Sequence, residues 1–184
     1  MSFDVLQEKI IAKKNPTVAG LDPKPEQIPP HILKAAYAEK GETLAGAAEA
    51  VWQFNKGLID ALKDVVPAVK PQAAYYERLG WQGLAVMEKT IAYAKEQGLF
   101  VITDIKRGDI GSTAQAYADA WLGETQVGAA ALTAFGADCV TLNGYMGSDT
   151  VGPFVDTCKK YDKCLFLLAK TSNPGSGELQ NLTA

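Results

Sequence analysis

The chain has 184 residues, of which 47% are hydrophobic and 21% charged, and this composition excludes disordered, collagen-like and disulfide-scaffold proteins. Lys and Arg number 18 and Asp and Glu 21, and the resulting net charge of -3 argues against a general nucleic-acid binder. No apolar stretch approaches the roughly 20 residues of a membrane span, so we expect neither nucleic acid nor a membrane as a partner. The three cysteines form no CxxC pair, and we interpret them as reduced thiols of a cytoplasmic protein.

Short apolar runs alternate with segments of helical periodicity along the chain. The predicted strands are 17–22, 68–72, 99–106, 139–143 and 164–170, and the predicted helices are 44–63, 84–97, 112–121 and 149–159. Because the strands mostly lack in/out alternation, we expect them to be buried on both faces, and we expect the Pro-rich segment 23–30 to be a loop. This series predicts a parallel sheet covered by helices, either an open doubly wound sheet or part of a (β/α)8 barrel.

The sequence TDIKRGDI at 103–110, at the end of the third predicted strand, is the most informative motif. Side chains two residues apart in a strand share a face, so Asp104 and Lys106 are expected to project together, with Ile105 on the opposite face. The carboxyl ends of parallel strands are where α/β proteins build their sites. Gly108 then turns the chain, and Asp109 could reach a neighbouring element or subunit. A structural ion pair at the strand end is the alternative interpretation.

Two other predicted strands end in residues that could join this site. Lys70 would be costly to bury unpaired, and if the second and third strands are adjacent it could reach Asp104. The result would be a Lys–Asp–Lys row extended by Asp109, although a lysine such as Lys70, taken alone, is more often at the surface. Asp22 could accept hydrogen bonds from substrate hydroxyls, or it could simply begin a turn before Pro23.

The remaining sequence offers little support for a metal or cofactor. The polar segment TSNPGSG at 171–177 could recognise a base or a phosphate, but it lacks the lysine of a P-loop. His31 is the only histidine, which argues against a His-based triad, and Cys and His lack the spacing of metal ligands. No GxGxxG pattern is present, so we expect no dinucleotide, and overall neither cofactor nor metal.

Asp22, Lys70, Asp104-x-Lys106-x-x-Asp109 and the sequence TSNPG at 171–175, in this order at successive strand ends, resemble the orotidine 5'-phosphate decarboxylase family. The sequence TDIKRGDIGSTA at 103–114 is most similar to the longer bacterial branch of that family. The resemblance covers essentially the whole chain. It implies a TIM (β/α)8 barrel, with about the first five β/α units in this chain. It also implies cofactor-independent decarboxylation of orotidine 5'-phosphate to uridine 5'-phosphate in pyrimidine biosynthesis.

The resemblance further implies which residues carry the chemistry. Lys106 corresponds to the proton donor to C6 of the pyrimidine. Asp104 would lie against the departing carboxylate, and Lys70 would pair with Asp104 and the ribose. A fixed ammonium beside a developing carbanion is the largest kind of stabilisation available without a cofactor.

Other positions correspond to substrate-binding and subunit-sharing residues of the family. Asp109 is similar to the aspartate that enters the partner subunit's site, which implies a homodimer with shared active sites. Ile110 and Thr113 would follow it across the interface. Asp22 would bind ribose hydroxyls, and Ser172 would contact the pyrimidine edge.

The family's phosphate-binding loops follow later strands, and residues 1–184 contain no matching segment. We therefore expect residues 1–184 to be a single (β/α) barrel domain that is truncated on its C-terminal side. Two alternatives remain open. One is a Mg-dependent sugar-phosphate decarboxylase or aldolase that shares Asp-x-Lys-x-x-Asp on the same scaffold, and the other is an inactive nucleotide-binding fragment.

Overall fold

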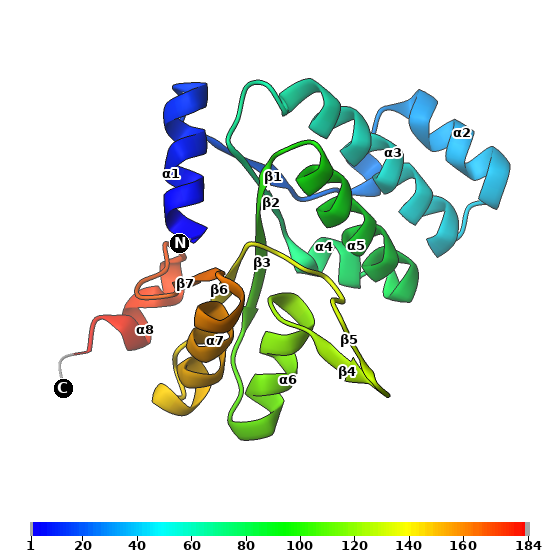
Figure 1. Cartoon of the computed structure of the whole chain (residues 1–184). Helices are drawn as coiled ribbons and strands as arrows, with labels where there is room; N and C mark the ends of the chain where they lie inside the picture. The colour runs from blue at the N-terminus through cyan, green and yellow to red at the C-terminus, as the bar shows by residue number, and fades with distance from the viewer. Residues whose placement is uncertain (1, 183–184) are drawn as a thin grey trace.

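A five-stranded parallel sheet organises the computed structural model, which describes residues 2–182 (Figure 1). Its strands, in sheet order, are β1 (Val18–Leu21), β2 (Ala68–Pro71), β3 (Phe100–Arg107), β6 (Cys139–Leu142) and β7 (Cys164–Leu167). This order follows the order of the strands along the chain, whereas a doubly wound sheet reverses direction at a switch point. The topology therefore supports the winding of a barrel. All five predicted strands are confirmed, with ends shifted by up to three residues.

Helices connect the strands and cover the sheet. They are α1 (Ser2–Lys13), α2 (Pro30–Lys40), α3 (Leu44–Leu62), α4 (Ala73–Glu77), α5 (Gly80–Glu96), α6 (Gly111–Trp121), α7 (Ser148–Tyr161) and α8 (Gly177–Gln180). An antiparallel ribbon of β4 (Thr125–Val127) and β5 (Ala130–Leu132) lies between α6 and β6. The four predicted helices correspond to α3, α5, α6 and α7.

Helices α1, α2, α4 and α8 and the β4–β5 ribbon are not predicted from the sequence. The segment 23–30 is only partly a loop, because it contains a 3-10 turn at Pro25–Gln27 and ends in the first residue of α2. Proline is compatible with the first turn of a helix, where its missing N–H is not needed, so Pro30 begins α2 instead of preventing it. His31 consequently lies on this helix.

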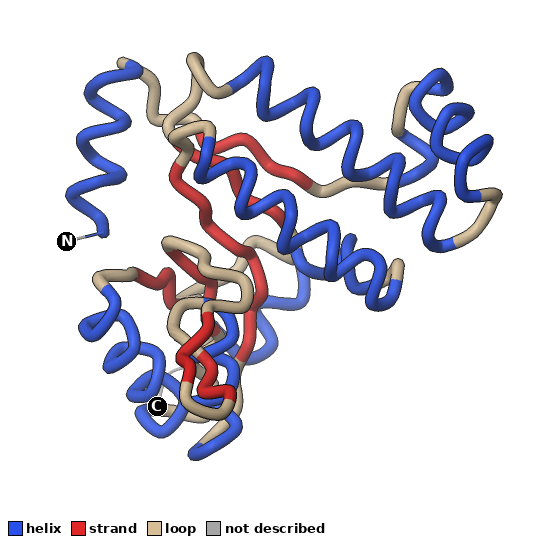
Figure 2. Tube along the Cα trace, turned by 45° about the vertical axis from the view of Figure 1, so that its right-hand side comes forward, coloured by secondary structure: helices blue, strands red, loops and turns tan. Residues whose placement is uncertain are grey.

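The two faces of the sheet pack against different partners. On one face, residues such as Val69, Val101 and Val140 join the large core beneath the outer helices. On the other face, residues from the N-terminal halves of β2, β3, β6 and β7 meet Leu6 of α1 in a smaller cluster: Ala68, Phe100, Ile102, Cys139 and Cys164. Figure 2 shows α1 on the opposite side of the sheet from α3 and α5. Because this cluster involves the N-terminal parts of the strands, their C-terminal ends are left free to carry polar residues.

The expectation of burial on both faces is right for the inner strands and wrong for β1 and β7. Each of these two strands pairs with a single neighbour in the sheet. Val18 of β1 is 37% exposed, and Phe166 and Leu167 of β7 are 43% and 47% exposed. Apolar composition alone does not distinguish an inner strand from an edge strand, since both positions use the same residue types.

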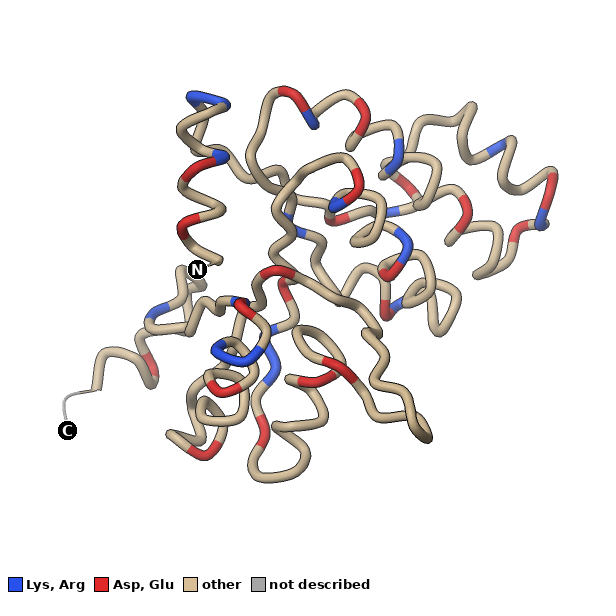
Figure 3. Tube along the Cα trace, in the orientation of Figure 1, with Lys and Arg blue, Asp and Glu red and all other residues tan. Residues whose placement is uncertain are grey.

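Charged residues of both signs are interspersed over the outer helices (Figure 3). Within residues 2–182, no helix is both long enough and apolar enough to span a membrane.

A buried polar contact fixes the short helix that follows β2. The Tyr76 hydroxyl accepts a hydrogen bond from Asn55 Nδ2 at 2.8 Å and donates to the carbonyl of Leu21 at 3.4 Å. Helix α5 then approaches α4 so closely that a Cβ on Gly83 would lie 1.9 Å from the Tyr76 carbonyl oxygen. Glycine at this position therefore allows α4 to stay at the end of β2.

This close approach predicts opposite effects for two helical glycines. Gly83→Ala should lower the free energy of unfolding by about 1–3 kcal/mol, because the added methyl group overlaps backbone. Gly57→Ala on α3 is the matched control, since a Cβ there meets nothing within 4 Å. It should raise the free energy of unfolding by roughly 0.5–1 kcal/mol through helix propensity. Urea denaturation measures both, and equal effects of the two substitutions would contradict the packing argument.

Candidate functional site

The carboxylate of Asp104 is the centre of a hydrogen-bonded cluster at the C-terminal end of the sheet. Its Oδ1 accepts from Lys106 Nζ at 2.6 Å and from Thr141 Oγ1 at 2.7 Å. Its Oδ2 accepts from Gln72 Nε2 at 2.9 Å and from Lys70 Nζ at 3.1 Å. The Asp104 side chain is 8% exposed, against 33% for Lys70 and 46% for Lys106. A buried negative charge therefore lies between two ammonium groups that remain open to solvent.

The strand register explains why these residues meet. Lys70, Asp104 and Thr141 each lie two residues beyond a member of the cluster that packs on α1, so they continue the same face of the sheet. Their strands, β2, β3 and β6, are immediate neighbours. The predicted adjacency of the second and third strands is thereby confirmed, and so is the contact between Lys70 and Asp104.

A bulge in β3 brings Lys106 back onto Asp104. Between the pairs Thr103–Val140 and Arg107–Leu142, β3 contains three residues and β6 contains one. Lys106 has φ +45°, in the left-handed region, and its N–H donates to Thr141 Oγ1 at 3.0 Å. Strain of this kind in a non-glycine residue costs on the order of 1 kcal/mol and is typical of functional sites. Asp104 and Lys106 thus project together as predicted, with Ile105 buried, although the strand is not regular.

The surroundings of Asp104 keep it ionised. Burial by itself would raise the pKa of Asp104, but hydrogen bonds from Lys106, Thr141 and Lys70 outweigh burial and hold this pKa below its ordinary value of 3.8. The site therefore presents a fixed row of alternating charge, with a carboxylate between two lysines.

Three predicted residues lie outside this cluster within the single chain. Asp22 is exposed after β1 and lines a separate cavity of about 240 Å³. Asp109 is half-buried, and its Oδ1 accepts from the N–H of Ile110 at 2.8 Å. Ile110 is 52% exposed at the start of α6. The predicted extension of the charge row to Asp109 is not formed within one chain, and a role in a partner's site stays a prediction.

The last two predicted residues are also on the surface. Thr113 is exposed on the first turns of α6, and Ser172 is exposed in the segment after β7. This segment is held by Gln180, which accepts from the N–H of Thr171 at 2.7 Å and donates to its Oγ1 at 2.8 Å. Gln180 and Thr171 line a cavity of about 340 Å³ at the ends of β6 and β7. The segment that carries Ser172 is thus tied to the C-terminal edge of the sheet.

Sequence reasoning missed Gln72, Thr141 and Gln180. Gln72 follows Lys70 at the end of a strand, and a polar residue at that position could have been predicted as part of the site. Thr141 lies inside an apolar strand, where a threonine is ordinary, and only the pairing of β3 with β6 shows what it contacts. Among residues 2–182, no three His, Cys, Asp or Glu side chains are grouped as metal ligands would be.

A parallel sheet wound in chain order, with charged side chains at the carboxyl ends of its strands, defines a protein of the (β/α)8-barrel class. Comparison with known proteins then identifies the family. The chain belongs to the orotidine 5'-phosphate decarboxylase / HUMPS family, whose model matches residues 20–184.

Curated relatives agree with this assignment. An orotidine 5'-phosphate decarboxylase of Caldicellulosiruptor saccharolyticus is 39% identical over 180 residues, which are 98% of this chain and 59% of the relative. One from Rhodopirellula baltica is 42% identical over 178 residues, which are 97% of this chain and 57% of the relative. The chain therefore spans less than two thirds of the length of these relatives.

A solved structure supports the fold. The OMP decarboxylase of Leishmania donovani superposes with a TM-score of 0.71 at 33% identity, covering 100% of this chain and 59% of that one. The five strands and their helices therefore correspond to part of a (β/α)8 barrel. This confirms the predicted fold class.

The lowered pKa of Asp104 predicts a pH-dependent stability. Asp104→Asn should lower the free energy of unfolding by roughly 1–3 kcal/mol at neutral pH, because four donors lose a charged acceptor. As the pH falls below about 3.8, the unfolded chain binds the proton before the folded chain does, so the wild-type advantage shrinks. It is lost as the pH falls through the lower pKa of the folded state. Urea denaturation over a pH series measures the difference.

The matched control is Asp64→Asn, which alters a carboxylate that is 88% exposed and paired with Lys13 at 3.8 Å. It should change stability by less than about 1 kcal/mol. A wild-type advantage over Asp104→Asn that persists unchanged into strong acid would contradict the assignment of a stabilised, ionised Asp104.

Proposed function

We propose that the protein to which this chain belongs catalyses cofactor-independent decarboxylation of orotidine 5'-phosphate to uridine 5'-phosphate. The observation that carries this proposal is the Lys70–Asp104–Lys106 row, with Asp104 accepting from both ammonium groups. The names of the relatives indicate the substrate. The Lys70–Asp104–Lys106 row provides charges that are suited to decarboxylation.

The reaction breaks the bond from C6 of the pyrimidine to its carboxyl carbon and leaves the electron pair on C6. Lys106 donates a proton to C6, and its ammonium stabilises the negative charge that develops there. Removal of one such preorganised donor costs ~3–4 kcal/mol in other enzymes. Asp104 lies beside the departing carboxylate. Hydrogen bonds from Lys70 and Gln72 to Asp104 Oδ2 keep the Asp104 side chain in place.

The substrate-binding residues belong to the same proposal. Asp22 binds ribose hydroxyls, and Ser172 contacts the pyrimidine edge from the segment that Gln180 holds. Asp22 directly follows β1 and Ser172 lies in the segment after β7, so both come after the carboxyl ends of strands, at the edge of the sheet where the charge row lies.

We further propose a cytoplasmic homodimer with shared active sites. Asp109 enters the partner's site, and Ile110 and Thr113 accompany it across the interface. The exposure of Ile110 and Thr113 at the start of α6 supports this arrangement. Residues 1–184 form one (β/α) barrel domain whose further units lie outside this sequence, a proposal supported by the 57% and 59% coverage of the relatives.

Decarboxylation of orotidine 5'-phosphate by the 184-residue chain, with a chelator present, tests the function. Lys106→Ala should lower kcat/KM by at least about 10³-fold, because it removes both the charge and the proton donor. Lys56→Ala, which removes an exposed lysine of α3, is the matched control and should keep wild-type activity. Thermal unfolding establishes that each variant is folded.

Wild-type turnover by Lys106→Ala would contradict the assigned mechanism. Activity lost to the chelator would favour the Mg-dependent alternative. A folded wild-type chain that releases no CO2 would show that this chain by itself is not an active decarboxylase.

Mixing two inactive variants tests the shared sites. Lys106→Ala and Asp109→Ala should each be inactive alone, whereas their hybrid dimer contains one intact site. Random pairing should restore roughly a quarter of wild-type activity, as expected for a two-fold dimer. Subunit exchange is verified by native mass spectrometry, and exchange without recovered activity would show that Asp109 serves its own chain.

A further inference from the structure

The hydroxyl of Thr141 connects the backbone of Lys106 to the carboxylate of Asp104. Thr141 lies on β6 and is 9% exposed, and its Oγ1 accepts a hydrogen bond from the Lys106 N–H at 3.0 Å. The same hydroxyl donates its proton to Asp104 Oδ1 at 2.7 Å. Because an ionised carboxylate only accepts and an amide N–H only donates, the direction of both hydrogen bonds is fixed. One hydroxyl on β6 therefore contacts two residues of the charge row on β3.

The backbone of Lys106 depends on an acceptor at this place. A bulge in β3 puts the three residues 104–106 opposite Thr141 alone, so the regular pairing of the two strands is interrupted there. Lys106 has φ +45°, in the left-handed region, which residues other than glycine rarely adopt. The Thr141 hydroxyl accepts the N–H of this residue from across the strand pair. The hydroxyl thus stabilises a conformation that the chain would otherwise leave.

Thr141 also acts on the other end of the Lys106 side chain. Asp104 Oδ1, which accepts from Thr141, accepts from Lys106 Nζ at 2.6 Å as well. Lys106 is consequently held at two points, at its N–H directly and at its ammonium through Asp104. The other three donors to Asp104 are lysine and glutamine side chains, which reach it through several rotatable bonds. A threonine hydroxyl is one rotatable bond from the backbone, so β6 itself sets its position.

The Thr141 hydroxyl favours the ionised form of Asp104 without adding a charge. Burial raises the pKa of Asp104, whereas hydrogen bonds from Lys106 and Thr141, among others, lower this pKa and prevail. A variant without the hydroxyl keeps both lysines and the carboxylate. It therefore separates the effect of position from the effect of charge.

We propose that Thr141 is a positioning residue for the proton donor Lys106. Its hydroxyl holds the left-handed backbone of Lys106 and, through Asp104 Oδ1, the direction of the Lys106 ammonium. The ammonium is thereby preorganised for proton transfer to C6 of the pyrimidine. This inference rests on the proposed decarboxylation, in which Lys106 donates that proton. Thr141 acts through Lys106 and Asp104 and not on the substrate.

Thr141→Val tests the proposal, because valine keeps the shape of threonine and removes only the hydroxyl. In decarboxylation of orotidine 5'-phosphate, Thr141→Val should lower kcat at least about tenfold and change KM by less than about threefold, since a misplaced donor affects the transition state more than substrate binding. Thr141→Ser restores a hydroxyl and should keep at least about a third of the wild-type kcat. Thermal unfolding establishes that each variant is folded. If Thr141→Val does not fold, Thr141→Cys replaces it, because a thiol is a weak donor and acceptor.

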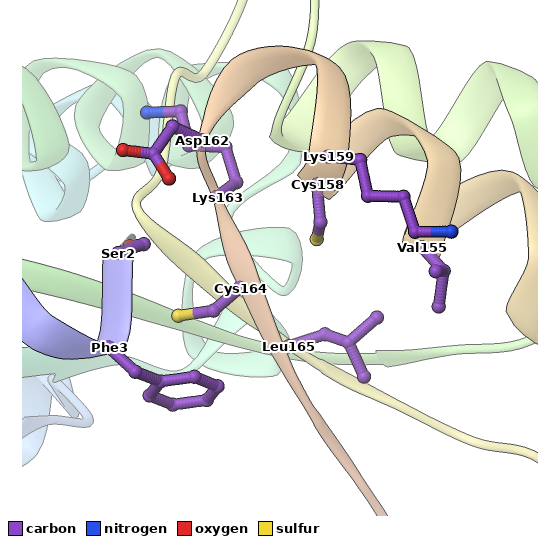
Figure 4. Close-up of a pocket in the computed structure, with 9 residues that line it drawn as sticks. All are labelled: Ser2, Phe3, Val155, Cys158, Lys159, Asp162, Lys163, Cys164 and Leu165. Atoms are coloured by element: carbon purple, nitrogen blue, oxygen red, sulfur yellow. The ribbon is translucent and has the colours of Figure 1, made fainter.

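Thr157→Val is the matched control. Thr157 on α7 is 4% exposed, and its hydroxyl accepts from Gln115 Nε2 at 3.3 Å. Figure 4 shows the next residue, Cys158, near Cys164 and Leu165 at the start of β7. The charge row lies at the opposite ends of the strands. The control therefore removes a buried, hydrogen-bonded threonine hydroxyl away from the row and should keep the wild-type kcat.

A second measurement needs no substrate. NMR titration of the Asp104 carboxyl carbon in the folded chain should give a higher pKa in Thr141→Val than in the wild type, and an unchanged pKa in Thr157→Val. The Cα chemical shift of Lys106 depends on its backbone angles. This shift should change in Thr141→Val and stay the same in Thr141→Ser.

The two measurements distinguish this inference from the proposed function. If the wild-type chain releases no CO2 but both NMR changes appear, the chain by itself is not an active decarboxylase, and Thr141 still positions Lys106. An Asp104 pKa and a Lys106 shift that match the wild type in Thr141→Val would overturn the inference. In an active chain, an unchanged kcat in Thr141→Val would also overturn it, as would equal losses in Thr141→Ser and Thr141→Val.

Discussion

The charge on Asp104 is the constraint on which the site depends. A carboxylate that is 8% exposed is stable only when donors replace the water it has lost, and here four donors come from β2, the residue that follows it, β3 and β6. Two of them are ammonium groups, and two are neutral. The neutral donors, Gln72 and Thr141, complete the coordination without further charge, so the lysines stay directed toward the open end of the sheet. The same contacts require the bulge in β3 and the left-handed backbone of Lys106.

The two-faced packing of the sheet determines where this row can lie. The outer helices cover one face along the length of the inner strands, whereas α1 meets the other face only where the strands begin. Apolar residues therefore occupy the beginnings of the inner strands, and the next residues on the same face are free to be Lys70, Asp104 and Thr141. The position of one helix, α1, therefore decides which end of this face is apolar and which end is charged.

The same face differs in character at its two ends. At the carboxyl ends, fixed charges are suited to stabilise a carbanion, and the proposed decarboxylation uses them. At the amino ends, where α1 packs, the paired residues Cys139 and Cys164 belong to an apolar cluster.

The sequence by itself determined the series of strands and helices, the family, and the residues of the charge row, because apolar runs and the motif at 103–110 are local signals. Only the tertiary structure decided which strands lie at the edges, that α1 covers the second face, and that Gln72, Thr141 and Gln180 hold the site. Neutral polar residues carry no distinctive pattern, and their partners lie on other strands or beyond a turn. The order of the strands likewise depends on pairing between segments that are distant in the sequence. The observed order distinguishes the winding of a barrel from that of a doubly wound sheet.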